Sequence, residues 1–114
     1  MELEDFQKIA STLKGTEEDI KWENHLCFCI AGKIYAILSL DVHPVTISFK
    51  VREEEFEEIS SQEGFRQAPH LARNKWVYCQ NANLVKFSDW KQYLTTSYEL
   101  VKSKLPKKVQ QQLQ

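Results

Sequence analysis

The feature that most constrains the fold is a two-residue apolar rhythm that recurs three times between residues 24 and 51. Apolar side chains alternate over 26–30, 34–40 and 45–51, with turn-forming residues between the runs. Side chains leave a pleated strand on alternate faces, so this period predicts three β-strands. Short connections of this kind favour an antiparallel meander, whose apolar face needs cover from helices or further strands.

The connection between the first two strands leaves two registers open. A two-residue turn at Ala31-Gly32 would place Phe28 opposite Tyr35. A three-residue loop with Gly32 in the left-handed region would place Phe28 opposite Ala36. We favour the second register because it brings the two most apolar faces together.

The segments on either side of the meander carry mostly helical periods. Apolar residues at three- and four-residue steps predict an amphipathic helix over 3–14 that Gly15 ends. The acidic stretch 16–19 resembles a capping arrangement and predicts a single helical turn. A change of period over 52–61 predicts a second helix, with glutamates in its first turn where they complement the helix dipole.

The second half of the chain adds two short strands and a last helix. Residues 65–74 contain a proline and are expected to be irregular, whereas 76–79 and 83–86 are expected to be strands. Ser88 is a good N-cap for a helix that Pro106 ends. The order is helix, three strands, helix, two strands, helix. It predicts an α+β fold of two layers, with helices covering one face of an antiparallel sheet.

Length and composition fit one soluble globular domain over residues 1–114, with a polar tail expected to fray from 106 to 114. The chain is 42% apolar and 27% charged, which is ordinary for such a domain. No apolar run approaches the ~18 residues of a membrane span, and the acidic N-terminus does not resemble a signal peptide. We therefore expect a cytoplasmic protein with no membrane role.

The three cysteines, Cys27, Cys29 and Cys79, are an odd number, which indicates reduced thiols in an unsecreted chain. His25 precedes the first two, but a His-x-Cys-x-Cys strand lacks the Cys-x2-Cys spacing of a zinc knuckle. We expect all three to be small buried residues. Neither a metal nor a cofactor is expected.

Charge is divided unevenly along the chain. Residues 1–63 hold 6 Lys/Arg and 14 Asp/Glu, a balance of −8, and residues 64–114 hold 9 and 2, a balance of +7; together they give the net −1. Such asymmetry is typical of a nucleic-acid-binding face, although the two halves can also attract one another within the fold. The total argues against strong non-specific binding to duplex DNA.

Short segments in a fixed order along almost the whole chain carry a family resemblance: Asn24-His25-Leu26, Gly32-Lys33, Ser48-Phe49-Lys50, Glu54-Glu55-Phe56, Gly64, Ala68-Pro69-His70-Leu71-Ala72-Arg73, Lys75-Trp76-Val77, Ser97-Tyr98-Glu99-Leu100-Val101 and Lys104-Leu105-Pro106-Lys107-Lys108. In these segments the chain resembles the MmcQ/YjbR family of small bacterial proteins. His70 departs from the pattern, which usually has tyrosine there, and a histidine adds pH dependence. The resemblance implies a fold similar to type III secretion chaperones and a DNA-binding role without catalytic residues.

The densest group of candidate DNA contacts lies in the second half: Arg66, His70, Arg73 and Lys75, interleaved with Phe65, Trp76 and Tyr78. Cationic groups neutralise phosphates, and aromatic faces can stack on exposed bases. Lys33 at a hairpin tip and Lys50 after the third strand are a second candidate contact. The structural alternative is that Arg73 ties the irregular segment to the acidic helix over 53–58.

Two functions therefore compete. The first is a DNA-binding module that contacts phosphates through these basic residues. The second is a protein-interaction module, either a homodimer or a chaperone-like adaptor, because one sheet face (Cys27, Cys29, Tyr35, Ile37) is not fully polar. Catalysis is not expected, since the chain has no Gly-x-Ser-x-Gly elbow, no His-Glu-x-x-His motif and no phosphate-binding glycine loop.

Overall fold

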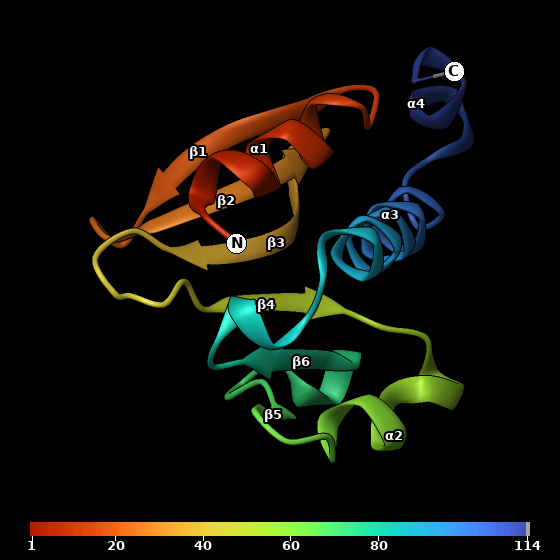
Figure 1. The fold of residues 1–114 in the computed structure, drawn as a ribbon. Coiled ribbons are helices and arrows are strands. Elements are labelled where there is room, and N and C mark those ends of the chain that lie inside the picture. The colour runs from red at the N-terminus through yellow and green to blue at the C-terminus, as the bar shows by residue number, and fades with distance from the viewer. Residues whose placement is uncertain (114) are drawn as a thin grey trace.

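A computed structural model describes residues 1–113, which contain one six-stranded antiparallel sheet (Figure 1). The strand order across the sheet is β1-β2-β3-β4-β6-β5, and every neighbouring pair is antiparallel. The strands are β1 Thr16–Lys21, β2 His25–Ile30, β3 Lys33–Ser39, β4 Ile47–Lys50, β5 Phe65–Gln67 and β6 Trp76–Cys79. The meander predicted from the apolar rhythm is therefore present as the neighbours β2, β3 and β4.

Within the described residues the α-helices are α1 Leu3–Ser11, α2 Phe56–Ser60, α3 Phe87–Lys102 and α4 Lys107–Gln112, and short 3-10 helices form at Glu53–Glu55, Ala72–Asn74 and Ala82–Leu84. Helix α3 packs on β3 and β4 and against α1, whereas α2 packs on β5 and β6 (Figure 1). Helices thus cover one face of an antiparallel sheet, which confirms the α+β prediction.

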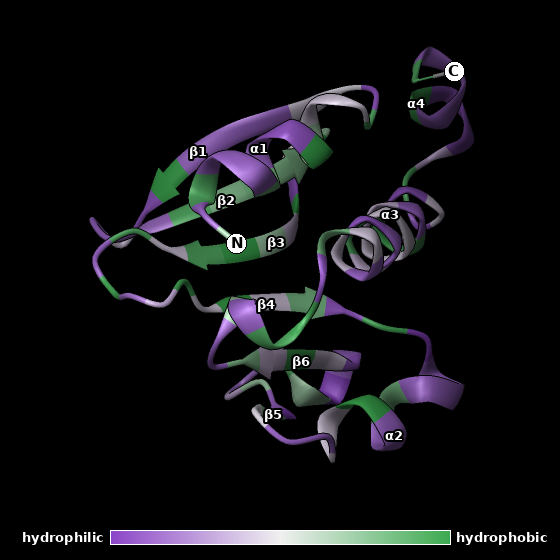
Figure 2. Ribbon diagram, in the orientation of Figure 1, coloured by the Kyte–Doolittle hydropathy of each residue, from purple (hydrophilic) through white to green (hydrophobic). Residues whose placement is uncertain are grey.

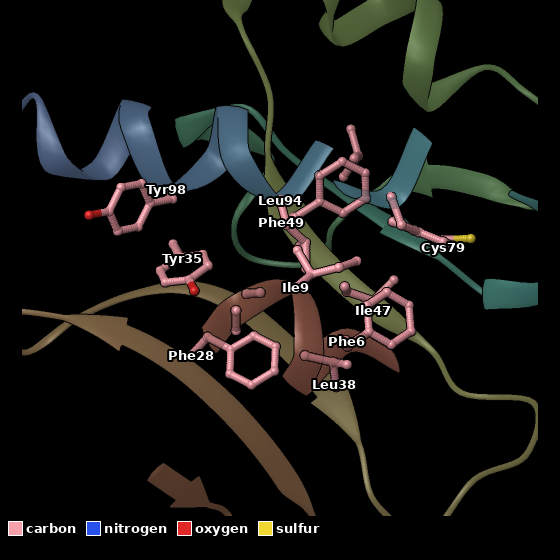
Figure 3. Close-up of a cluster of buried hydrophobic side chains, with 14 of the residues drawn as sticks. Phe6, Ile9, Phe28, Tyr35, Leu38, Ile47, Phe49, Cys79, Leu94 and Tyr98 are labelled. Carbon is pink, nitrogen blue, oxygen red and sulfur yellow. The ribbon is translucent and has the colours of Figure 1, made fainter. Parts of the chain in front are cut away.

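One hydrophobic core fills the space between the helices and the inner face of the sheet (Figure 3). The fully buried ring of Trp90 in α3 lies 5.3 Å from Phe6 of α1 and 5.5 Å from Phe49 of β4, both edge to face. Trp90 Nε1 donates a 2.8 Å hydrogen bond to the carbonyl oxygen of Ala82, so its buried polar atom is satisfied. Figure 2 shows the matching pattern, with β2 and β3 mainly apolar and β1 mainly hydrophilic.

The prediction of a helical turn over 16–19 is wrong, because these residues form edge strand β1. All six residues of β1 pair with β2. Thr16 Oγ1 also lies 2.9 Å from Tyr35 Oη in a hydrogen bond, and Gln7 of α1 donates to Glu18. Pairing therefore overrides a weak local preference for a turn. Carboxylates along a free edge also discourage pairing with another acidic strand.

Two short segments of the second half differ from expectation. Residues 65–67, expected to be irregular, form β5 against β6. Residues 83–86, expected to be a strand, contain most of a 3-10 helix instead. The cause lies in Asn81, whose side-chain oxygen accepts a 2.9 Å hydrogen bond from the backbone N–H of Asn83. Such an Asx turn competes with strand pairing.

The C-terminal segment, expected to fray from residue 106, instead contains α4. Pro106 is its N-cap residue, and Gln110 Nε2 donates a 2.7 Å hydrogen bond to the Leu105 carbonyl oxygen. Val109 and Leu113 pack against the core cluster. Residue 114 lies outside the described residues. Helix α3 also begins earlier than expected, with Lys86 rather than Ser88 as its N-cap.

The favoured register is confirmed, although a different turn produces it. Phe28 pairs with Ala36, as expected. The turn contains only Ala31 and Gly32, whose φ angles of 48° and 80° define a type I′ turn. A β-bulge then shifts the register between Phe28 and Cys29, and Tyr35 is the extra residue.

The bulge also turns Tyr35 inward, which corrects its expected place on the second sheet face. Tyr35 is fully buried, with its ring 6.1 Å from that of Phe28 and 5.5 Å from that of Tyr98. The apolar residues of the outer face are instead Cys27, Cys29 and their neighbours on β3.

As for the membrane, residues 1–113 contain no helix long and apolar enough to span one.

Candidate nucleic-acid interface

The bulge at Tyr35 ends the pairing of β3 with β4, and a side chain from α3 replaces the missing ladder bonds. The last paired residues at this end are Ala36 and Phe49. Beyond them, the Lys50 backbone N–H donates a 3.0 Å hydrogen bond to Ser97 Oγ, which donates a 2.6 Å bond to the Tyr35 carbonyl oxygen. Ser97 is completely buried. One hydroxyl therefore joins both strands to α3 where they separate.

A cleft opens at this end of the sheet, with a volume of about 420 Å³. We term it the cationic cleft; its lining residues are Lys33, Ile34, Lys50, Asn74, Trp76, Val101, Lys104 and Leu105. Its three lysines come from the start of β3, the end of β4 and the segment after α3. Among residues 1–113 no carboxylate lines the cleft, and apolar side chains form much of its wall. The arrangement suits an anion rather than a cation.

Two lysines of the cationic cleft, Lys50 and Lys104, repel each other. Burial lowers the pKa of Lys50, and the positive charge of Lys104 lowers it further. Lys50 Nζ donates a 2.7 Å hydrogen bond to the Asn74 carbonyl oxygen, which positions the ammonium at the edge of the cleft. A bound anion would offset both the desolvation of Lys50 and its repulsion by Lys104.

A second pocket of about 270 Å³ also includes Lys50, but its charges are mixed. Arg52 on its wall pairs with Glu55 at 3.3 Å, and Asp89 adds another carboxylate. Burial raises the pKa of Tyr93, so this phenol stays protonated at neutral pH. Carboxylates disfavour a phosphate here, which leaves the cationic cleft as the better anion site.

The structure places the six predicted contact residues in different surroundings. Lys33 and Lys50 both line the cationic cleft. Arg66 instead stacks its guanidinium over the Tyr78 ring, with 4.7 Å between the guanidinium carbon and the ring centroid. Lys75 has a left-handed backbone, with φ 65°, and its Nζ lies 5.1 Å from the centroid of the Phe56 ring in α2. His70 and Arg73 are exposed in the connection between β5 and β6.

Arg73 does not form the ion pair proposed as the structural alternative. In residues 1–113 the ion pairs are Lys21–Asp19 and Arg52–Glu55, and neither involves Arg73. Contact between this connection and α2 comes instead from Lys75 over the Phe56 ring.

The aromatic residues near these basic groups offer little surface for base stacking. Phe65 packs 6.5 Å from both Phe49 and Trp90 in the core. Trp76 is only 7% exposed, and Arg66 covers one face of Tyr78. The site therefore favours contacts to phosphates over contacts to unstacked bases.

Sequence reasoning missed Lys104 and Ser97 as parts of this site. In the sequence, Lys104 stood out only within a segment that carries the family resemblance. Ser97 likewise stood out only within such a segment, on the last helix. A small polar residue on an otherwise apolar helical stripe was the available signal, since a buried hydroxyl needs a partner.

The three cysteines are free and buried, as expected for small core-like residues. Cys79 belongs to the core cluster, and its Sγ donates to the Asn81 carbonyl oxygen at 3.3 Å. Burial raises the pKa of Cys27 to about 11, so this thiol stays protonated at neutral pH. Burial likewise raises the pKa of Cys29.

The fold and the cleft define a small α+β protein with a cationic site at one end of its sheet. The chain belongs to the YjbR family, whose model matches residues 11–100. This confirms the resemblance found in the sequence. The search of curated proteins found no match.

Two crystal structures share the fold. Protein DR2400 of Deinococcus radiodurans, with family-model domain DUF419, superimposes with a TM-score of 0.87 at 23% identity, over 97% of this chain and 86% of that one. A Pseudomonas syringae protein, Northeast Structural Genomics Consortium target PsR293, gives a TM-score of 0.71 at 20% identity, over 88% of this chain and 98% of that one. At these identities the similarity concerns the fold alone.

Proposed function

We propose that this YjbR-family protein binds DNA without catalysing a reaction, and that the cationic cleft receives backbone phosphates. The observation that carries the proposal is the meeting of Lys33, Lys50 and Lys104 around one cleft, on whose wall the described part of the chain places no carboxylate. A phosphate would relieve the repulsion that helps to lower the pKa of Lys50. Because exposed aromatic rings are scarce there, the contacts would be electrostatic and largely independent of sequence.

The test is a fluorescence-anisotropy titration of a short labelled duplex at several salt concentrations. Three phosphate contacts predict a slope of log K against log salt near −2.7, or a loss of about 40-fold in affinity for a fourfold rise in salt. The combined variant Lys33→Gln/Lys50→Gln/Lys104→Gln is expected to bring the slope close to zero. Thermal unfolding followed by circular dichroism would establish that the variant is folded.

Lys91→Gln is the matched control, because it removes the same charge from an exposed position of α3. It lies about 16 Å along the helix axis from the C-terminal end of α3. Its slope should equal that of the unmodified protein. Unchanged binding by the cleft variant would contradict the proposed site. An absence of binding by the unmodified protein at low salt would contradict the function itself.

The basic residues outside the cleft provide a further comparison. A variant with Arg66→Gln, Arg73→Gln and Lys75→Gln removes an equal number of positive charges from the β5–β6 region. If this variant lost the salt dependence while the cleft variant kept it, the phosphates would lie along that hairpin instead. The proposal predicts the opposite order of effects.

A further inference from the structure

The outer face of the sheet is free of helices within residues 1–113. Buried residues of α1, α2 and α3, such as Phe6, Phe56 and Leu94, all belong to the core on the inner face. Leu26, Phe28 and Ile30 of β2 also point to that core, so the residues between them point outward. On this outer face the central Cys27 is buried, whereas Asp19 and Arg66 at its two edges are exposed.

One row of side chains crosses this outer face from edge to edge. The pairing registers align six residues, one from each strand in the order β1, β2, β3, β4, β6 and β5: Asp19, Cys27, Ile37, Ser48, Tyr78 and Arg66. The four central residues are uncharged. The two ends carry opposite charges.

The acidic end is reinforced by a second carboxylate. Glu17 lies two residues from Asp19 on the same exposed strand, so the two share a face. Lys21 pairs with Asp19 at 3.0 Å and offsets part of this charge, but Glu17 forms no ion pair in residues 1–113. At the other end, Arg66 is exposed and stacks on Tyr78. The face thus runs from acidic through uncharged to basic.

We propose that this outer face is a homodimer interface, with a two-fold axis running parallel to the strands between β3 and β4. Such an axis places β1 of one copy over β5 of the other. Asp19 then faces Arg66 of the partner subunit, and symmetry repeats the contact in the opposite direction.

The charge pattern favours a two-fold axis parallel to the strands and a second copy of the chain as the partner. An axis perpendicular to the strands would stack β1 on β1, and the carboxylates would repel. A two-fold interface also requires complementary groups at equal distances on either side of the axis. The row meets this requirement, because two strands lie between each charged end and the centre. A second copy of the chain therefore fits the face.

The proposed axis also brings the two cationic clefts to the same end of the dimer. Rotation about an axis along the strands exchanges the edges of the sheet but not its ends. The dimer would consequently present two phosphate sites side by side, which raises avidity for a polyanion. This consequence depends on the proposed function, whereas the dimer itself does not.

The contact is small, so the dimer is expected to be weak. Six strands about 4.8 Å apart and about five residues long give roughly 400 Å² per subunit. A standard interface buries about 800 Å² per partner. Dissociation constants in the micromolar to sub-millimolar range are therefore expected, and the measurement must extend to high protein concentration.

Sedimentation equilibrium of the full chain without nucleic acid tests this proposal. The unmodified protein should show a monomer–dimer equilibrium. Asp19→Arg and Arg66→Asp should each weaken dimerisation by about tenfold or more, because each puts like charges at both contacts. An equimolar mixture of the two variants should restore dimerisation, since the mixed dimer has opposite charges at both contacts.

Glu99→Arg is the control, because Glu99 is exposed on α3, which packs on the inner face of the sheet. It should leave dimerisation unchanged, and thermal unfolding should show that all variants are folded. A monomer up to about 1 mM would overturn the proposal, since this exceeds the expected range for such a contact. So would a dimer insensitive to the single variants, or a mixture that stays monomeric. These outcomes leave the DNA measurement unaffected.

Discussion

Ser97 determines how the sheet and α3 meet beside the cationic cleft. Its hydroxyl accepts from the Lys50 backbone and donates to the Tyr35 carbonyl oxygen in a site without exposure to solvent. Both backbone groups lie where the β3–β4 ladder has ended. Since buried backbone groups require partners, this hydroxyl makes the separation of the strands possible.

Replacing Ser97 tests this role. Ser97→Ala leaves two buried backbone groups without a partner, so the free energy of unfolding should fall by about 2–3 kcal/mol. Denaturant unfolding monitored by tryptophan fluorescence gives the value. Ser103→Ala is the matched control, because Ser103 is exposed and its hydroxyl bonds only to the Leu100 carbonyl oxygen. A loss as small as that of the control would show that Ser97 is not needed at the junction.

Individual contact residues were only partly predictable from the sequence. Lys33 and Lys50 were expected as a secondary contact, and the structure brings them together with Lys104. Their meeting depends on the bulge at Tyr35. The position of this bulge depends on contacts with the partner strand and with α3. The residues around Tyr35 do not by themselves indicate those contacts, so the bulge could not be predicted from the local sequence.

The elements were more predictable where an apolar period was strong. Alternating apolar residues identified β2, β3 and β4, and helical stripes identified α1 and α3. The acidic strand β1 has no such period, because it is an edge strand that takes its structure from pairing with β2. Helix α4 was missed for a related reason, since only Val109 and Leu113 connect it to the core.

Helix α4 offers a direct test of whether the C-terminal segment is part of the fold. Leu113 packs against the core cluster, and a side chain added at Gly15 would collide with it. Val109→Ala/Leu113→Ala should therefore lower the free energy of unfolding by about 1–3 kcal/mol, somewhat less than full-core substitutions because both residues are only partly buried. A frayed tail would give no change in chemical denaturation. Amide exchange over 107–112 provides the independent readout.

In the whole molecule, opposite charges are separated in some places and mixed in others, since Glu55 and Asp89 share a pocket with Lys50. Carboxylates of β1 occupy one edge of the sheet, whereas the cationic cleft lies at the end where β3 begins and β4 finishes. The uneven charge of the two halves was visible in the sequence. The sequence did not show that negative charge would lie along one edge of the sheet and positive charge at one end of the strands. The topology of the fold decides which residues become neighbours.

The central claim is that phosphates enter the cationic cleft, and amide chemical-shift mapping with a short duplex at low salt tests it most directly. The largest shifts are predicted at Gly32, Lys33, Lys50, Asn74 and Lys104, and they should diminish as salt is raised. Shifts confined to the β5–β6 connection around Arg66 and Arg73, or no shifts at all, would contradict the claim.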